Sequence, residues 1–141
     1  YHLVNHDAGK VGDVVRSYPD LKSFLKSRRR WEFDNFMCRV IAGTANQPKV
    51  GHLGEETYQQ AIENLRRDFL FIGLFEDLEN SLARLNHFIP VEYSQLPHVN
   101  KGRYRNDLDA ETVDLLTAAN SYDQRLYQEA LSLVQQGTHV A

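Results

Sequence analysis

The residues best suited to chemistry lie in a short basic loop, His98–Arg105, that follows an aromatic and proline-containing segment. Lys101, Arg103 and Arg105 place three cations within five residues, and Gly102 exposes a backbone N–H among them. Guanidinium, ammonium and free N–H groups are the donors that hold a phosphate or sulfate. The same residues also fit an ordinary solvated turn, so the loop by itself leaves both interpretations open.

The composition indicates one globular domain over residues 1–141. The chain has 42% hydrophobic and 25% charged residues, which is typical of a domain with a hydrophobic core. Its net charge of −3 argues against a binder of nucleic-acid polymers, because such domains are usually basic overall. Any anion site must therefore be local. No apolar run is long enough to cross a bilayer, so the sequence predicts no membrane segment.

The histidines and the single cysteine offer weaker sites. His2 and His6 have the i, i+4 spacing of metal ligands, but no third ligand lies near them, and we expect no metal site. Cys38 has no neighbouring histidine or cation pair that would lower its pKa, so we expect a core residue rather than a nucleophile. Asn35 and Arg39 are i, i+4 neighbours that either face a cleft together or share a polar surface.

Apolar spacing and capping residues predict five to six helices around these residues. They are expected at Pro19–Ser27, Asp34–Gly43, Gly54–Asp68, after Asp77, at Ala110–Ala119 and at Tyr122–Gln135. The cations Arg28–Arg30 suit the end of the first helix as well as they suit a binding role. In the second helix we expect Asp34 to be the cap, and the inward stripe to be Phe36, Met37, Val40 and Ile41. Ser121 and Gln124 have the form of a capping box before the last helix.

One short stretch has the pattern of a strand. Phe69–Leu74 is continuously apolar and aromatic-rich, which is typical of a strand buried on both faces of a parallel sheet. No second run of this strength occurs in the chain, so we expect it to pair with strands outside these residues. The chain also opens at Tyr1 without a methionine or a start signal for an element, which favours residues missing upstream.

Several segments follow one another in a distinctive order, over roughly residues 30 to 135: Asn35 with Cys38–Gly43, Ala61–Leu65, Phe69–Leu78, Ser81–Leu82 and Leu108–Tyr127. This order resembles the C-terminal half of sulfotransferases that use 3′-phosphoadenosine 5′-phosphosulfate (PAPS). The likeness is greatest to the branch that includes Golgi carbohydrate sulfotransferases and many bacterial relatives. It implies a mainly α chain with one short buried strand, forming the C-terminal part of a P-loop-like α/β fold, in the Golgi lumen of a eukaryote or the cytoplasm of a bacterium.

The resemblance assigns the basic loop to the 3′-phosphate of PAPS. Lys101, Gly102 and Arg103 are the expected contacts, with Asn100 and Arg105 as weaker candidates. PAPS would be the co-substrate, without a metal, and the acceptor a hydroxyl or amine of a carbohydrate or small molecule.

The phosphosulfate loop and the Arg/Ser segment of the family are not in this chain, which implies pairing with a missing N-terminal half. The catalytic base is therefore unassigned, and His2, His6 and His52 are only weak candidates. The parent protein is expected to be the enzyme. A different class stays open, a non-enzymatic helical interaction module in which Lys101–Arg105 is an exposed turn.

Overall fold

The structure is a computed structural model that describes residues 14, 16–28, 30–44, 51, 53–90 and 108–137. Within these residues the chain is mainly helical, as predicted, and contains no strand. Its elements are α3 (Leu21–Ser27), η1 (Trp31–Phe33), α4 (Phe36–Ile41), α5 (Glu55–Asp68), η2 (Phe75–Asp77), α6 (Leu78–Leu85), α7 (Ala110–Ala119) and α8 (Ser121–Gln136), where η marks a 3₁₀ turn.

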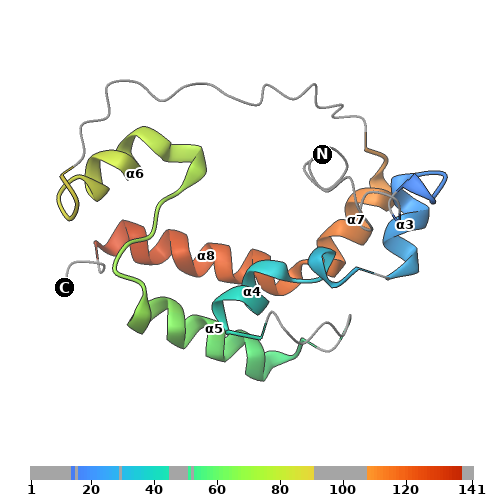
Figure 1. Cartoon of the computed structure of the whole chain (residues 1–141), viewed down its shortest axis with the longest axis horizontal. Coiled ribbons are helices and arrows are strands. Elements are labelled where there is room, and N and C mark those ends of the chain that lie inside the picture. The colour runs from blue at the N-terminus through green and yellow to red at the C-terminus, as the bar shows by residue number, and fades with distance from the viewer. Residues whose placement is uncertain are drawn as a thin grey trace.

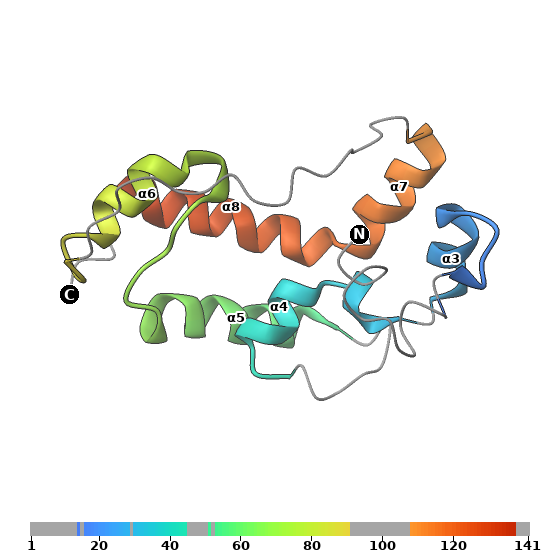
Figure 2. The same cartoon turned by 45° about the horizontal axis from the view of Figure 1, so that its top comes forward.

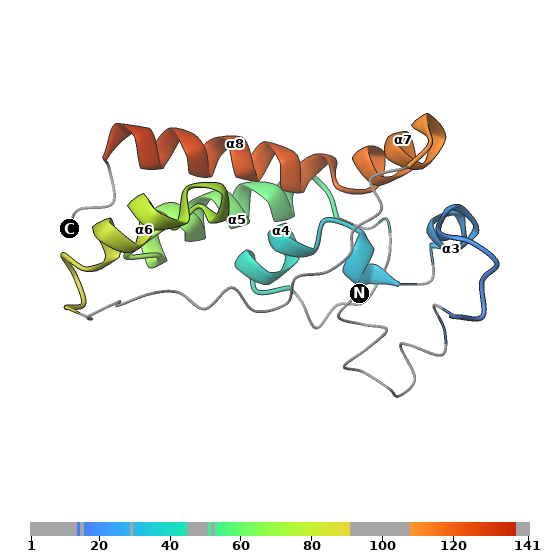
Figure 3. The same cartoon turned by 90° about the horizontal axis from the view of Figure 1, so that it is seen from above.

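Helix α8 is the long axis around which the other helices are arranged (Figure 1). Helices α4 and α5 pack against it and against each other, and α5 lies beside α8 (Figure 3). Helices α3 and α7 pack together at one end of the molecule, whereas α6 lies at the other end (Figure 2). In this part of the chain, no helix has both the length and the apolar character needed to cross a membrane.

The predicted helix Gly54–Asp68 is confirmed as α5. Its buried residues are Tyr58, Ala61, Ile62 and Leu65, which recur at the three- and four-residue spacing of one helix face. Acidic residues in its first turn and arginines in its last turn match the helix dipole. This face meets buried side chains of α4 and α8, so the core of the described residues lies between these three helices.

Helices α4 and α8 cap each other at their N-termini. Asn35, the N-cap of α4, accepts hydrogen bonds through Oδ1 from the backbone N–H groups of Tyr122 (2.8 Å) and Asp123 (3.2 Å). In return, the Asp123 carboxylate accepts from the N–H groups of Met37 (2.9 Å) and Cys38 (2.8 Å). Each side chain therefore satisfies N–H groups that the other helix leaves without an intrahelical partner.

These contacts overturn two predictions about caps. Ser121 does not cap α8, because it is already the first helical residue and no side chain of its own segment bonds the helix start. Asp34 does not cap α4 either. Its carboxylate instead pairs with Arg39 Nη2 at 2.7 Å and accepts a bond from the Gly51 N–H at 2.6 Å. The cap of each helix thus comes from the other helix, which local sequence patterns do not record.

The predicted inward face of α4 is wrong for most of its residues. Cys38 and Arg39 are buried, at 0% and 3% exposure, and Ile41 is half-buried. The other three residues of the expected apolar stripe are exposed by 39% to 48%: Phe36, Met37 and Val40. The reason is that the capping contacts and the buried ion pair of Arg39 fix the rotation of this short helix.

The predicted strand Phe69–Leu74 is not present. The segment is extended but runs alone between α5 and η2, and Phe69 and Leu70 are 40% and 57% exposed. Strand structure requires a neighbouring strand, and none of the described residues provides one. At its end, the Ser81 hydroxyl donates to the Leu74 carbonyl and accepts from the Leu74 N–H, which fastens the segment to α6.

The boundaries of the remaining helices agree with the predictions within two residues. Helix α3 begins at Leu21 rather than Pro19, because the Asp20 carboxylate accepts the Ser23 N–H at 2.7 Å and makes Asp20 the N-cap. Helix α6 follows Asp77 as expected, although the Asp77 side chain makes no capping bond. Helix α7 covers Ala110–Ala119 as predicted and begins after its N-cap, Asp109.

The reciprocal caps predict a large effect for Asn35→Ala. The variant loses both bonds to α8 and places alanine at φ 52°, so we expect the free energy of unfolding to fall by about 2–3 kcal/mol in urea denaturation. Asn35→Gly should lower the free energy of unfolding by less than Asn35→Ala, because glycine tolerates this backbone conformation. Asn80→Ala, which removes an exposed asparagine of α6, is the control and should change stability by less than about 0.5 kcal/mol. Equal stability of Asn35→Ala and wild type would contradict the capping role.

Candidate functional site

The residues that the sequence assigns to anion binding, Asn100, Lys101, Gly102, Arg103 and Arg105, lie outside the described residues. The histidines His2, His6 and His52 lie outside them as well. The structure does place both ends of the segment that contains the loop. It leaves the described chain at Pro90, after α6, and returns at Leu108, just before α7.

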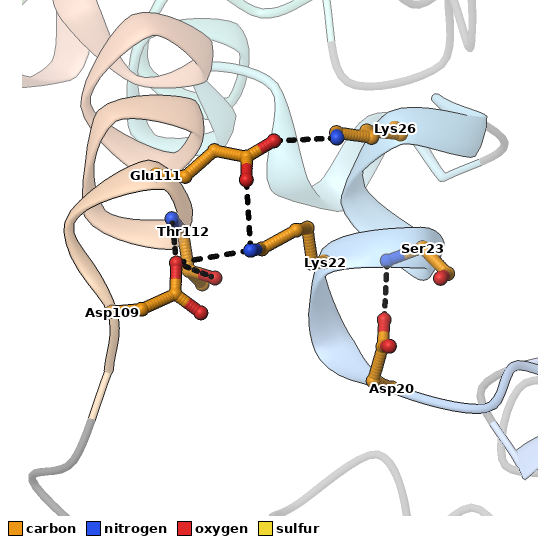
Figure 4. Close-up of polar contacts among 7 residues, drawn as sticks. All are labelled: Asp20, Lys22, Ser23, Lys26, Asp109, Glu111 and Thr112. Atoms are coloured by element: carbon orange, nitrogen blue, oxygen red, sulfur yellow. Dashed lines mark hydrogen bonds and ion pairs between the residues drawn. The ribbon is translucent and has the colours of Figure 1, made fainter.

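The downstream end of this segment is held by a cluster of charges between α3 and α7 (Figure 4). Asp109, the N-cap of α7, accepts hydrogen bonds through Oδ1 from the N–H of Thr112 (2.9 Å) and from its hydroxyl (3.1 Å). Lys22 of α3 lies 3.1 Å from the same oxygen and 2.8 Å from Glu111. Lys26, one turn later, pairs with the other oxygen of Glu111 at 2.5 Å. We call these two lysines and two carboxylates the α3–α7 clamp.

The contacts of the clamp shift the pKa values of Glu111, Asp109 and Lys22. Bonds from Lys22 and then Lys26 lower the pKa of Glu111, and the Thr112 N–H, followed by Lys22, lowers the pKa of Asp109. Glu111, followed by Asp109, raises the pKa of Lys22. A carboxylate whose pKa is lowered by folding stabilises the fold at pH values above its ordinary pKa, and this stabilisation is lost as the pH falls through its pKa in the folded protein. A lysine whose pKa is raised by folding stabilises the fold at pH values below its ordinary pKa, and this stabilisation is lost as the pH rises through its pKa in the folded protein. The clamp is therefore complete between the ordinary values of 4.5 for Glu and 10.5 for Lys.

A cavity of about 400 Å³ lies between α3, η1 and α7. One side is apolar, and its rings Phe24 and Phe33 meet edge to face with centroids 5.0 Å apart. The α7 side consists of Leu115, Ala118 and Ala119. Its charged lining comes from four residues: Lys26, Arg28, Arg30 and Asp34. We call this space the α3–α7 cavity.

Three of the four charges that line the α3–α7 cavity are already neutralised. Lys26 belongs to the clamp, Arg30 donates through Nε and Nη2 to the Glu32 carboxylate, and Asp34 is paired with Arg39. Arg28 differs, because within the described residues its guanidinium has no carboxylate partner. The sequence marked Arg28 and Arg30 only as a run that suited a helix end or a binding role. The cavity brings these two cations together with aromatic rings and with α7, a contact between segments about 90 residues apart.

The polar residues of α4 are internal rather than a functional cleft. Asn35 and Arg39 are 5% and 3% exposed and are hydrogen-bonded within the fold. They therefore neither face a cleft together nor share a polar surface, which were the two arrangements expected from the sequence. Cys38 is fully buried, and burial, followed by a contact with Asp123, raises the pKa of its thiol. Cys38 is therefore a core residue, as the sequence predicts. None of the described residues forms a group of three or more His, Cys, Asp or Glu side chains suited to a metal.

In another charged contact, on the surface between α5 and α8, the cation already has partners within the protein. The guanidinium of Arg125 lies 4.0 Å from the centre of the Tyr58 ring and pairs with Glu55 at 2.8 Å. Arg125, followed by Gln59, lowers the pKa of Glu55 to about 2. The cation is thus committed to an aromatic ring and a carboxylate, and this contact joins two helices rather than forming a ligand site.

No family model, curated protein or solved structure matches this chain.

The clamp predicts that Lys22→Met loosens the start of α7 at neutral pH. Methionine keeps the apolar stem but removes the charge, so we expect the Thr112 amide to exchange its hydrogen severalfold faster at pH 7, after correction for intrinsic rates. As the pH falls toward about 2, wild type and variant should converge, to within about twofold, because protonation of Asp109 and Glu111 removes the charges that pair with Lys22. Arg67→Met, which removes an exposed cation of α5, is the control. A difference that persists unchanged at about pH 2 would contradict an electrostatic clamp.

Proposed function

We propose that this chain contributes the 3′-phosphate-contacting loop of a PAPS-dependent sulfotransferase, within a P-loop-like α/β fold. The observation that carries the proposal is the order of the segments, in which the basic loop stands between α6 and α7. The fixed start of α7 supports it, because the clamp ties Asp109 to α3 only four residues after Arg105. A loop attached to a rigid framework can hold its donors toward a phosphate at low entropic cost.

The residues of the loop have distinct parts in this proposal. Arg103 presents a planar guanidinium that can bind two phosphate oxygens at once, and Lys101 adds a point charge. Gly102 lets the backbone N–H approach the phosphate without a side chain in the way. Asn100 and Arg105 flank these three and supply further donors. Together they would neutralise a group that carries close to two negative charges.

The proposed reaction moves a sulfuryl group from PAPS to an acceptor. The bond between sulfur and the bridging phosphate oxygen breaks as a new bond forms from sulfur to the acceptor oxygen or nitrogen, and 3′-phosphoadenosine 5′-phosphate (PAP) leaves. Cationic groups stabilise the charge that develops on the bridging oxygen, and a general base takes the proton of the acceptor hydroxyl or amine. The contribution proposed for this chain is to fix the nucleotide by its 3′-phosphate, and the general base is not assigned.

One observation favours a second candidate function, that of a non-enzymatic interaction module. Phe36 and Val40 on α4 are 44% and 48% exposed, and Leu70 before η2 and Phe75 in η2 are 57% and 84% exposed. A protein partner that covered these large apolar side chains would remove them from water. This function requires no anion binding at Lys101–Arg105, so the two candidates differ in a measurable property.

The sulfotransferase proposal predicts that PAP binds this chain through the loop. Isothermal titration calorimetry at low salt should detect PAP, and changing Lys101 and Arg103 together to Ala should weaken binding by about 2–4 kcal/mol, because two charge-assisted contacts are lost. Adenosine, which lacks both phosphates, should bind far more weakly than PAP. The control is Arg66→Ala with Arg67→Ala, which removes the same charge from exposed positions of α5 and should leave PAP affinity unchanged.

An unchanged PAP affinity in the Lys101 and Arg103 double variant would overturn the site. The same holds if the α5 control weakens binding equally, since the effect would then come from net charge alone. Absence of PAP binding, combined with concentration-dependent self-association of the wild-type chain in sedimentation velocity, would favour the interaction module.

A further inference from the structure

The α3–α7 cavity has the properties of a ligand site that is separate from the basic loop. We propose that it binds a small organic oxyanion, a phosphate, sulfate or carboxylate attached to a ring, and that Arg28 is the residue that anchors the charged group. This inference does not rest on the sulfotransferase proposal, because the residues that line the cavity are different from those of the loop.

Arg28 is an available cation. Lys26 and Arg30 are held by Glu111 and Glu32, whereas within the described part of the chain the Arg28 guanidinium is bonded to no carboxylate. Arg28 itself is exposed, so its charge is solvated rather than stranded. An oxyanion that enters the cavity therefore gains an ion pair with Arg28 without first breaking one among the residues that the structure describes.

The Arg28 guanidinium lies beside the backbone of Gly51, near the buried pair of Asp34 and Arg39. Arg28 is the C-cap of α3, and its N–H donates to the Leu25 carbonyl at 3.1 Å. The guanidinium lies against Gly51, where an added Cβ would be only 2.9 Å from Nη2. The Gly51 N–H donates to Asp34, which is itself buried and paired with Arg39. The Gly51 backbone therefore bounds one side of the space that the guanidinium can occupy.

The backbone of Arg28 adds a second indication. Its φ of 47° and ψ of 31° lie in the left-handed region, where glycine is favoured and a side chain costs about 1–2 kcal/mol. Glycine is the common residue at such helix ends. An arginine in this position makes the fold less stable than a glycine would. A role for its side chain in the cavity that it lines would explain why arginine occurs here.

The shape and lining of the cavity define the class of ligand. A volume of about 400 Å³ lies in the range of small-molecule sites and is too small for a folded partner. The wall of Phe24, Phe33 and Leu115 suits the apolar face of an aromatic or sugar ring. Inorganic phosphate or sulfate would use Arg28 and leave this wall uncovered. A ring that bears the oxyanion would use both.

The experiment titrates the ¹⁵N-labelled chain with phenyl phosphate at constant ionic strength and follows amide shifts. We expect shifts concentrated at Phe24–Phe33 and Leu115–Ala119, and binding at least about fivefold tighter than that of inorganic phosphate or phenol alone. Phenyl sulfate and benzoate, titrated in parallel, distinguish which oxyanion the site prefers. A PAP titration on the same sample separates this site from the loop, because its shifts should lie around Lys101–Arg103.

The decisive variant is Arg28→Gly, which removes the guanidinium and at the same time suits the left-handed backbone. The melting temperature should stay the same or rise, while phenyl phosphate binds at least about tenfold more weakly. Arg28→Lys keeps the charge and the backbone cost but loses the planar fork, and should weaken binding by about two- to fivefold. Arg67→Lys and Arg67→Gly on α5 are the matched controls for charge.

Three results would overturn the proposal. Phenyl phosphate affinity in Arg28→Gly equal to that of wild type would show that Arg28 is not the anchor. Inorganic phosphate that binds as tightly as phenyl phosphate would remove the role of the apolar wall. Shifts spread over all surface cations, and reduced equally by Arg67→Gly, would identify nonspecific ion binding. Loss of PAP binding in the variant with Lys101 and Arg103 changed to Ala tests the basic loop, and it has no bearing on these three results for the α3–α7 cavity.

Discussion

The mutual capping of α4 and α8 is the interaction on which the rest of the described structure depends. Asn35 and Asp123 together accept four backbone N–H groups across a sequence separation of about 87 residues. A helix of six residues such as α4 has little stability of its own, so these bonds and the packing around them decide that it forms and how it is rotated. That rotation buries Cys38 in the core and leaves Phe36 and Val40 outside.

The buried pair of Asp34 and Arg39 extends this constraint toward the α3–α7 cavity. Both groups are removed from water, which is costly, and the cost is offset because the Asp34 carboxylate also accepts the Gly51 N–H, while Arg39 Nε donates to the Asp34 carbonyl. Gly51 is in turn the backbone against which Arg28 lies. The buried ion pair is therefore linked, through the Gly51 backbone, to one side of the Arg28 guanidinium.

Helix α7 connects the two candidate sites. Its first turn is held by the α3–α7 clamp just after the basic loop, and its last turn lines the α3–α7 cavity. The two features also share Lys26, which pairs with Glu111 in the clamp and lines the cavity. The clamp that anchors the proposed nucleotide loop is therefore the contact that also positions one wall of the cavity.

The sequence by itself determined the mainly helical class and the spans of α5 and α7, because these depend on apolar spacing and capping residues within the same segment. It also singled out the basic loop and the run Arg28–Arg30. Only the tertiary structure decided which side of α4 is buried and which arginines line a cavity. It also decided that Phe69–Leu74 is an extended segment that pairs with no strand among the described residues. The physical reason is that these outcomes follow from hydrogen bonds and ion pairs between segments far apart in the chain, and apolar periodicity contains no record of such partners.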